Sequence, residues 1–154
     1  MFITPYAKGI YFHISNPSPI IWNGIVFHYN LRTKYTISND NISFVDVIAE
    51  PAGSATALKV EDNGWIKNIY FQNSTQAMTS TINYFKNAGY NFIKEENCLV
   101  LDKIRTFIIL EKNNEWLVHT FIPEKNIILH YTGDPSGYEY LKYIFLTTEY
   151  AKNK

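Results

Sequence analysis

Residues 104–132 read IRTFIILEKNNEWLVHTFIPEKNIILHYT, and this stretch decides the fold that the sequence predicts. Its apolar and β-branched residues fall into three runs, at residues 104–111, 115–122 and 126–132. Three residues separate each run from the next, Lys-Asn-Asn at 112–114 and Pro-Glu-Lys at 123–125. Short segments of polar residues and proline form turns between antiparallel strands. The stretch therefore predicts a three-stranded meander. Both alternating sides of the first two runs are largely apolar, which indicates central strands covered on both faces.

The apolar period changes upstream of the meander, where apolar residues recur at steps of three and four. They are Ala77, Met78, Ile82, Phe85 and Ala88, together with Thr81. Residues at these steps share one face of a helix, so we expect a helix over residues 74–88. Ser74 is placed to cap its first turn, and Gly89 follows its last residue with the conformational freedom that a helix end requires.

A second helix is expected at about residues 136–151. Its apolar stripe consists of Tyr138, Leu141, Ile144, Phe145 and Thr148. Ser136 and Glu139 have the spacing of a capping box, in which the two side chains satisfy free backbone N–H groups. Pro135 suits the entry to a helix because its ring already holds a helical φ.

Further strands are expected on both sides of the first helix. They are residues 9–14, 20–22, 25–29, 32–37, 42–49, 56–61, 65–72, 90–93 and 98–101. Asn23-Gly24 is a strong signal for a two-residue hairpin turn, and residues 94–97 are interpreted as another hairpin turn. The predicted class is α+β, with one domain over residues 1–154. It has a mainly antiparallel curved sheet of roughly 8–10 strands, with two helices (about 74–88 and 136–151) packed on it.

The composition favours a folded protein without a strongly charged partner. The chain has 154 residues with 14 Lys+Arg against 14 Asp+Glu, so its net charge gives no support to nucleic-acid binding. No apolar run reaches the roughly 18 residues of a membrane span, and the N-terminus lacks a signal-peptide pattern. Cys98 is the one cysteine, which suits a reducing compartment. We therefore expect a cytoplasmic protein that binds neither a membrane nor nucleic acid.

Familiar catalytic and cofactor motifs are missing from the sequence. It has no Gly-rich phosphate loop, no Cys-x-x-Cys, no His-Glu-x-x-His and no Gly-x-Ser-x-Gly. The four histidines show no close metal-ligand spacing. We expect no cofactor and no metal site, and a structural role for His119 in the middle of its strand.

One pair of short motifs does point to chemistry. His13-x-Ser15 and His130-x-Thr132 both read His-x-Ser/Thr at the end of an apolar strand. The pair resembles the signature of the 2H phosphoesterase family, whose two motifs lie on neighbouring central strands. The resemblance implies that His13 and His130 act as general base and acid on a phosphodiester, with Ser15 and Thr132 holding the phosphate oxygens. Alternate strand residues share a face, so each histidine would point with its hydroxyl partner into one cleft.

The surplus of aromatic residues suggests a protein interface. The chain carries 12 tyrosines, and tyrosine is enriched at interfaces because it buries a large ring and keeps a polar group. The candidate partner-binding residues are Tyr84, Tyr138, Tyr140, Tyr143 and Asp46. Asp46 interrupts an apolar strand, where a buried carboxylate needs a partner, and Arg105 is the expected one.

The favoured function is a small non-enzymatic protein-binding module, namely an immunity or inhibitor protein that neutralises a partner toxin or enzyme. The missing catalytic motifs, the surplus tyrosine and the small size support it. Abundant Ile, Asn, Lys, Tyr and Phe with scarce arginine indicate an AT-rich gene, typical of bacterial phage, plasmid and island genes. Two alternatives stay open: a phosphoesterase of the 2H type, and a small-ligand carrier whose pocket is lined by Phe and Tyr.

Overall fold

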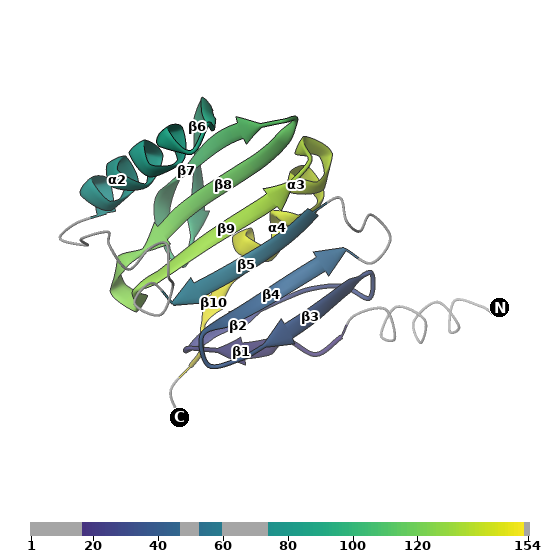
Figure 1. Cartoon of the computed structure of the whole chain (residues 1–154). Coiled ribbons are helices and arrows are strands. Elements are labelled where there is room, and N and C mark those ends of the chain that lie inside the picture. The colour runs from purple at the N-terminus through teal and green to yellow at the C-terminus, as the bar shows by residue number, and fades with distance from the viewer. Residues whose placement is uncertain (1–16, 47–52, 60–73, 153–154) are drawn as a thin grey trace.

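The computed structural model describes residues 17–46, 53–59 and 74–152, which form two antiparallel sheets and the helices around them (Figure 1). The elements are β1 (Ile20–Trp22), β2 (Ile25–Phe27), β3 (Thr33–Ile37), β4 (Asn41–Asp46), β5 (Gly53–Lys59), α2 (Ser74–Asn87), β6 (Asn91–Val100), β7 (Lys103–Lys112), β8 (Glu115–Ile122), the 3₁₀ turn η2 (Pro123–Lys125), β9 (Ile127–Gly133), α3 (Pro135–Leu141), α4 (Tyr143–Leu146) and β10 (Glu149–Tyr150). The predicted α+β class with a large antiparallel sheet is confirmed. The strands expected at residues 9–14 and 65–72 lie outside the described residues.

The larger sheet has seven strands in the order β3-β4-β5-β9-β8-β7-β6. The predicted meander is confirmed as β7, β8 and β9 on one side of this sheet. β9 pairs over its whole length with β8, from Trp116↔Gly133 to Ile122↔Ile127. The smaller sheet has the order β1-β2-β10, and its β1–β2 hairpin turns at Asn23-Gly24 with positive φ at both residues, as the sequence predicts.

Alternating residues of β7 show how the two faces of the large sheet are covered. Phe107 and Ile109 point into the main core, which also contains buried residues of α3, α4 and the small sheet. Ile108 and Leu110 point to the opposite face, where Phe85 of α2 packs against them. The helices therefore lie on opposite faces of the sheet (Figure 1), which explains why both sides of these strands are apolar.

The first predicted helix is confirmed, since α2 spans Ser74–Asn87. Gly89 has φ +95° just after its end, and the Gly89 N–H donates to the Lys86 carbonyl oxygen. A residue with a Cβ pays a steric penalty at that φ, so glycine suits the position.

The second predicted helix, at about residues 136–151, is wrong in its extent. The segment forms α3 and α4, and its last part pairs with β2 as the short strand β10. The hydroxyl of Thr147 donates to the Tyr143 carbonyl oxygen, and the hydroxyl of Thr148 donates to the Phe145 carbonyl oxygen. Such local bonds compete with helix continuation, and strand pairing then supplies the remaining backbone bonds.

The predicted N-cap of that helix is also wrong, because Asp134 caps α3 instead of Ser136. One Asp134 side-chain oxygen accepts from the Gly137 N–H at 2.6 Å and from the Ser136 hydroxyl at 3.1 Å. Pro135 occupies the first turn as expected. The carboxylate accepts more strongly than a hydroxyl and also complements the positive end of the helix dipole.

The hairpin turn predicted at residues 94–97 is wrong as well. These polar residues lie inside one long strand, β6, and pair with β7 from Lys94↔Ile109 to Asn97↔Thr106. β6 is an edge strand, where polar side chains are compatible with strand pairing. The turn lies farther on, at Leu101-Asp102, where φ is +51° and +68°.

We expect Asp102→Gly to raise the free energy of unfolding by about 0.5 kcal/mol, because glycine removes the steric cost of positive φ at this turn. Urea unfolding of both proteins measures the difference. Asp40→Gly is the matched control, since Asp40 is also an exposed turn aspartate but has no positive φ. An unchanged or lower stability of Asp102→Gly would contradict the assignment of strain to this turn.

Candidate functional site

The large sheet divides into a fork between β7 and β8. These strands pair from Lys112↔Glu115 to Ile108↔His119, and the described residues contain no β7–β8 pair beyond that point. β7 continues with β6 as far as Lys103, while β8 continues with β9 as far as Ile122. The Thr120 hydroxyl spans the gap and donates to the Thr106 carbonyl oxygen at 2.8 Å. A side chain thus replaces the backbone ladder where the strands diverge.

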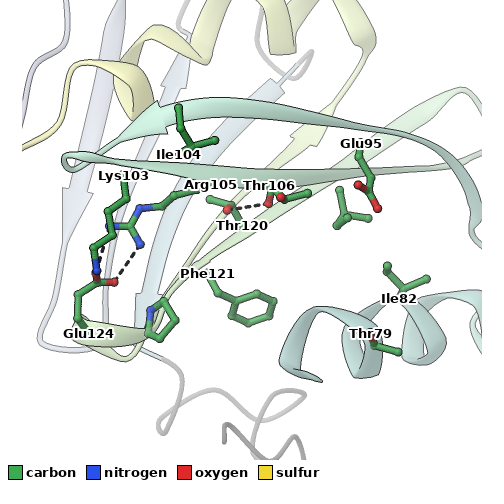
Figure 2. A pocket seen from close by; sticks show the side chains of 12 residues that line it. Thr79, Ile82, Glu95, Lys103, Ile104, Arg105, Thr106, Thr120, Phe121 and Glu124 are labelled. Carbon is green, nitrogen blue, oxygen red and sulfur yellow. Dashed lines mark hydrogen bonds and ion pairs between the residues drawn. The ribbon is translucent and has the colours of Figure 1, made fainter. Parts of the chain in front are cut away.

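A cavity of about 540 Å³ lies at this fork, between the diverging strands and α2 (Figure 2). Its lining combines aliphatic, hydroxyl and charged side chains. The lining residues are Thr79, Ile82, Glu95, Lys103, Ile104, Arg105, Thr106, Ile108, Thr120, Phe121, Pro123 and Glu124. The volume falls within the range of small-molecule and peptide-side-chain sites.

Arg105 closes the turn end of the fork with a buried guanidinium group. Its Nε donates to the Val100 carbonyl oxygen at 2.7 Å, and its Nη2 donates to the Leu101 carbonyl oxygen at 3.2 Å. Its Nη1 and Nη2 also donate to the two carboxylate oxygens of Glu124, at 2.9 and 3.3 Å. The one side chain therefore ties the β6–β7 turn to η2, on the other side of the fork.

The electrostatics of Glu124 follow from this arrangement. Partial burial acts to raise its carboxyl pKa, but hydrogen bonds from Arg105, from its own backbone and from Lys103 lower the pKa to about 2. Lys103 Nζ lies 3.1 Å from a Glu124 carboxylate oxygen and is largely exposed. Two cations thus share one ionised carboxylate.

We expect Arg105→Leu to lower the free energy of unfolding by about 2–4 kcal/mol, because it leaves two backbone carbonyls and a carboxylate without their donor. Lys103→Ala is the matched control and should change stability by less than about 1 kcal/mol, as exposed ion pairs do. Chemical denaturation of the three proteins measures both values. Equal effects of the two substitutions would show that Arg105 is not the brace of the fork.

An apolar surface adjoins the fork on the β6–β7 ribbon. We call it the ribbon patch; its members are Leu99 and Ile104. Phe92 and Ile93 are exposed at the other end of the ribbon, where Phe92 pairs with Leu110. Leu99 and Ile104 are cross-strand partners with exposed fractions of 60% and 68%. Ile104 also lines the cavity, so the patch and the fork are continuous.

The predicted partner-binding residues gather only in part: the Tyr140 and Tyr143 rings are 6.4 Å apart between centroids, and Arg32, which contacts Tyr140, also binds Asp46. Tyr138 is 1% exposed in the main core, and its hydroxyl donates to Glu96 at 3.3 Å. Tyr140 and Tyr143 are partly buried against the same core, and Tyr84 is exposed on α2. All four residues are tyrosines, but their exposed fractions differ because the surrounding packing decides which of them is buried.

Asp46 is buried on β4, and its partner is Arg32 rather than the expected Arg105. Arg32 Nη2 lies 3.1 and 3.4 Å from the two Asp46 carboxylate oxygens. The Arg32 guanidinium also stacks 4.5 Å from the Tyr140 ring centroid. The two arginines bind carboxylates at separate places, Arg32 at Asp46 of β4 and Arg105 at Glu124 of η2.

His13 and Ser15, which form the first predicted motif, lie outside the described residues. The structure therefore describes only the second motif, His130 and Thr132. His130 lies opposite His119 on the neighbouring strand, with parallel rings 5.7 Å apart between centroids. The hydroxyls of Thr132 and Ser54 are 3.2 Å apart. The phosphoesterase interpretation therefore stays a prediction.

Burial controls the protonation of this histidine pair. It lowers the pKa of His130 to about 4, and burial together with the neighbouring His130 lowers the pKa of His119 well below 6.5. His130 is therefore neutral at pH 7, and in the folded protein it stays neutral until the pH falls to about 4. In the unfolded chain both pKa values return to about 6.5.

We expect the protein to lose stability as the pH falls from about 6.5 to 4, because the unfolded chain then binds protons that the folded histidines refuse. The contribution of His130 is on the order of 3 kcal/mol across this window. His130→Gln should flatten the dependence. Urea unfolding at several pH values measures the slopes, and an unaltered slope in His130→Gln would contradict the assignment.

Sequence reasoning missed the fork. The sequence predicts that Arg105 pairs with Asp46, and it predicts for Thr106, Thr120 and Glu124 only positions in strands and a turn. A charged residue in an alternating apolar strand was the available signal. It indicated a buried charge without indicating where the charge would find its partners.

No group of three metal-ligating side chains occurs among the residues that the structure describes. Within the same residues, no helix has the length and apolar character needed to cross a membrane. Both statements apply to residues 17–46, 53–59 and 74–152.

No protein-family model matches this sequence, and no curated protein matches it. Among solved structures, the chain is similar to cyanobacterial PsbP (CyanoP) from Synechocystis sp., with 12% sequence identity and a TM-score of 0.47. The match covers 80% of this chain and 82% of that chain. A likeness at this level carries no argument about what the chain binds or does.

Proposed function

We propose that this chain is a non-enzymatic protein-binding module that acts in the cytoplasm as an immunity or inhibitor protein for a toxin or enzyme. The observation that carries the proposal is the ribbon patch beside the fork. Leu99 and Ile104 lie opposite each other there on an edge ribbon, and both large apolar side chains are exposed. Adjacent exposed apolar side chains support an interface with another protein.

The patch lies on rigid structure, which favours binding without a large ordering cost. Leu99 and Ile104 belong to two long strands that remain paired down to the turn. The Arg105 side chain anchors that turn to η2 through Glu124. Because little conformational freedom is lost on association, more of the contact energy contributes to affinity.

A second candidate function is a carrier of a small ligand, and the volume of the fork cavity favours it. Phe121 is the one aromatic residue among the described lining residues, whereas the sequence suggested a pocket lined by several Phe and Tyr. The lining also carries four charged side chains. A purely apolar ligand would leave those charges beside it without water, so a polar or extended ligand suits the cavity better.

We expect the double variant Leu99→Lys/Ile104→Lys to lose co-purification with the co-expressed product of the neighbouring gene, by tenfold or more relative to the unmodified chain. Charges placed at the centre of an apolar interface leave unpaired ions there. The control is Ile21→Lys/Leu31→Lys, which alters equally exposed apolar residues (62% and 58%) elsewhere on the surface.

Two results would contradict the proposal that the ribbon patch binds a partner. One is partner capture that is equal in the unmodified chain and in the Leu99→Lys/Ile104→Lys variant, with circular dichroism showing both folded. The other is selective loss of capture in the Ile21→Lys/Leu31→Lys control, which would move the interface to that surface.

A further inference from the structure

The strand β6 ends the large sheet and presents a long edge (Figure 1). It pairs with β7 on one side, and no described strand pairs with it on the other. Along this ten-residue strand, residues 91–95, 97 and 99 are exposed. The edge of such a strand can pair with an extended chain through main-chain hydrogen bonds.

The β6–β7 turn fixes which backbone groups of β6 face outward. The turn has two residues, so the pair that flanks it, Val100↔Lys103, is hydrogen-bonded, and hydrogen-bonded pairs then recur at every second position. Leu99, Asn97 and Glu95 belong to the pairs in between. The backbone N–H and C=O groups of such residues point away from the paired strand, and those of β6 therefore point to the outer edge.

A hydrogen bond on β7 supports this assignment. The Thr106 carbonyl oxygen accepts from the Thr120 hydroxyl of β8 at 2.8 Å, so this carbonyl points away from β6. Asn97 is the cross-strand partner of Thr106, and its backbone groups therefore point away from β7. Asn97 and its two outward-facing neighbours each offer one N–H donor and one C=O acceptor to an added strand.

The side chains of the same three residues form a graded row on one face of the sheet, because alternate strand residues share a face. Leu99 is apolar, 60% exposed and part of the ribbon patch. Asn97 is exposed, and its side-chain oxygen accepts from the Thr106 hydroxyl at 3.0 Å. Glu95 is exposed and forms no ion pair among the described residues. The row changes from apolar to anionic over roughly 13 Å.

A second copy of this chain fits the β6 edge poorly. Outward-facing residues pair with outward-facing residues, so Glu95 would lie opposite Glu95, Asn97 or Leu99 of the second copy. The first register brings two Glu95 carboxylates together, and the second brings two Glu96 carboxylates together. The third places the Glu95 carboxylate against an apolar side chain. Directly opposed like charges destabilise a strand pair, and a carboxylate without a polar partner is costly.

We infer that the outer edge of β6 binds an extended strand of the protein partner, antiparallel to β6. Read from its N-terminus, this strand places an apolar residue opposite Leu99, a polar residue opposite Asn97 two positions later, and a basic residue opposite Glu95 after two more. The apolar residue thereby meets the ribbon patch, and the basic residue neutralises the Glu95 carboxylate. This inference rests on the proposed protein-binding function and specifies how that function uses the ribbon.

The direction of the added strand follows from the sheet that it extends. Every described strand pair in the large sheet is antiparallel, and antiparallel pairing is slightly more stable per residue than parallel pairing. Five residues reach from the position opposite Leu99 to the position opposite Glu95. A short peptide can therefore represent the partner strand.

A charge exchange in the peptide tests the side-chain pattern with the full chain. The probes are the acetylated and amidated peptides Ile-Thr-Thr-Thr-Lys and Ile-Thr-Thr-Thr-Glu, and binding is followed by amide chemical shifts on titration. We expect the lysine peptide to bind about tenfold more tightly and to shift the signals of Glu95, Asn97 and Leu99. Glu95→Lys should reverse the preference. The matched control Glu115→Lys, at an exposed glutamate outside β6, should keep it.

N-methylation of the lysine peptide tests the main-chain hydrogen bonds. The N–H of its third residue faces Asn97 in the inferred register, whereas the N–H of its fourth residue faces solvent. We expect N-methylation of the third residue to weaken binding by tenfold or more, because it removes a donor and obstructs the approach of the two strands. N-methylation of the fourth residue is the matched control and should weaken binding less than threefold.

Equal binding of the lysine and glutamate peptides, binding of neither, or equal effects of the two N-methylations would overturn the inference. If neither peptide binds while Leu99→Lys/Ile104→Lys still abolishes capture of the native partner, the protein-binding function stands and the added strand fails. If the lysine peptide binds at β6 while that variant keeps its partner, the strand site stands and the ribbon patch fails as the partner interface.

Discussion

The pairing of β9 along its whole length with β8 is the constraint on which the other elements depend. These strands are buried on both faces, so they accept apolar side chains in both directions and leave room for layers on each side. β5 and β7 extend the sheet from this pair, and α2 and the α3–α4 segment cover opposite faces. A shift of one residue in this register would exchange the side chains that point to the two layers.

The fork arises where this constraint ends. β7 follows β8 for five pairs and then stays with β6, while β8 stays with β9. Arg105 makes the separation stable because its guanidinium satisfies two turn carbonyls and an ionised carboxylate at once. A buried guanidinium requires that many partners. The same geometry produces the cavity between the diverging strands and α2.

Local patterns predicted those elements whose structure depends on local chemistry. The helix at α2, the Asn23-Gly24 turn and the three central strands match their predicted places, since periodicity and turn residues specify them directly. The strand at β6 and the end of the last helix were mispredicted because their neighbours decide them. Polar residues 94–97 remain extended through pairing with β7, and residues 149–150 leave the helix to pair with β2.

The sequence by itself determined the α+β class, the meander and the presence of charged residues within apolar strands. Only the tertiary structure decided that Arg105 pairs with Glu124 and Asp46 with Arg32, that Tyr138 is buried while Tyr84 is exposed, and that β7 and β8 diverge. The physical reason is that hydrophobic periodicity reports which face of an element is buried. It does not report which distant element supplies the opposite charge or the cover, because those contacts join residues far apart in the chain.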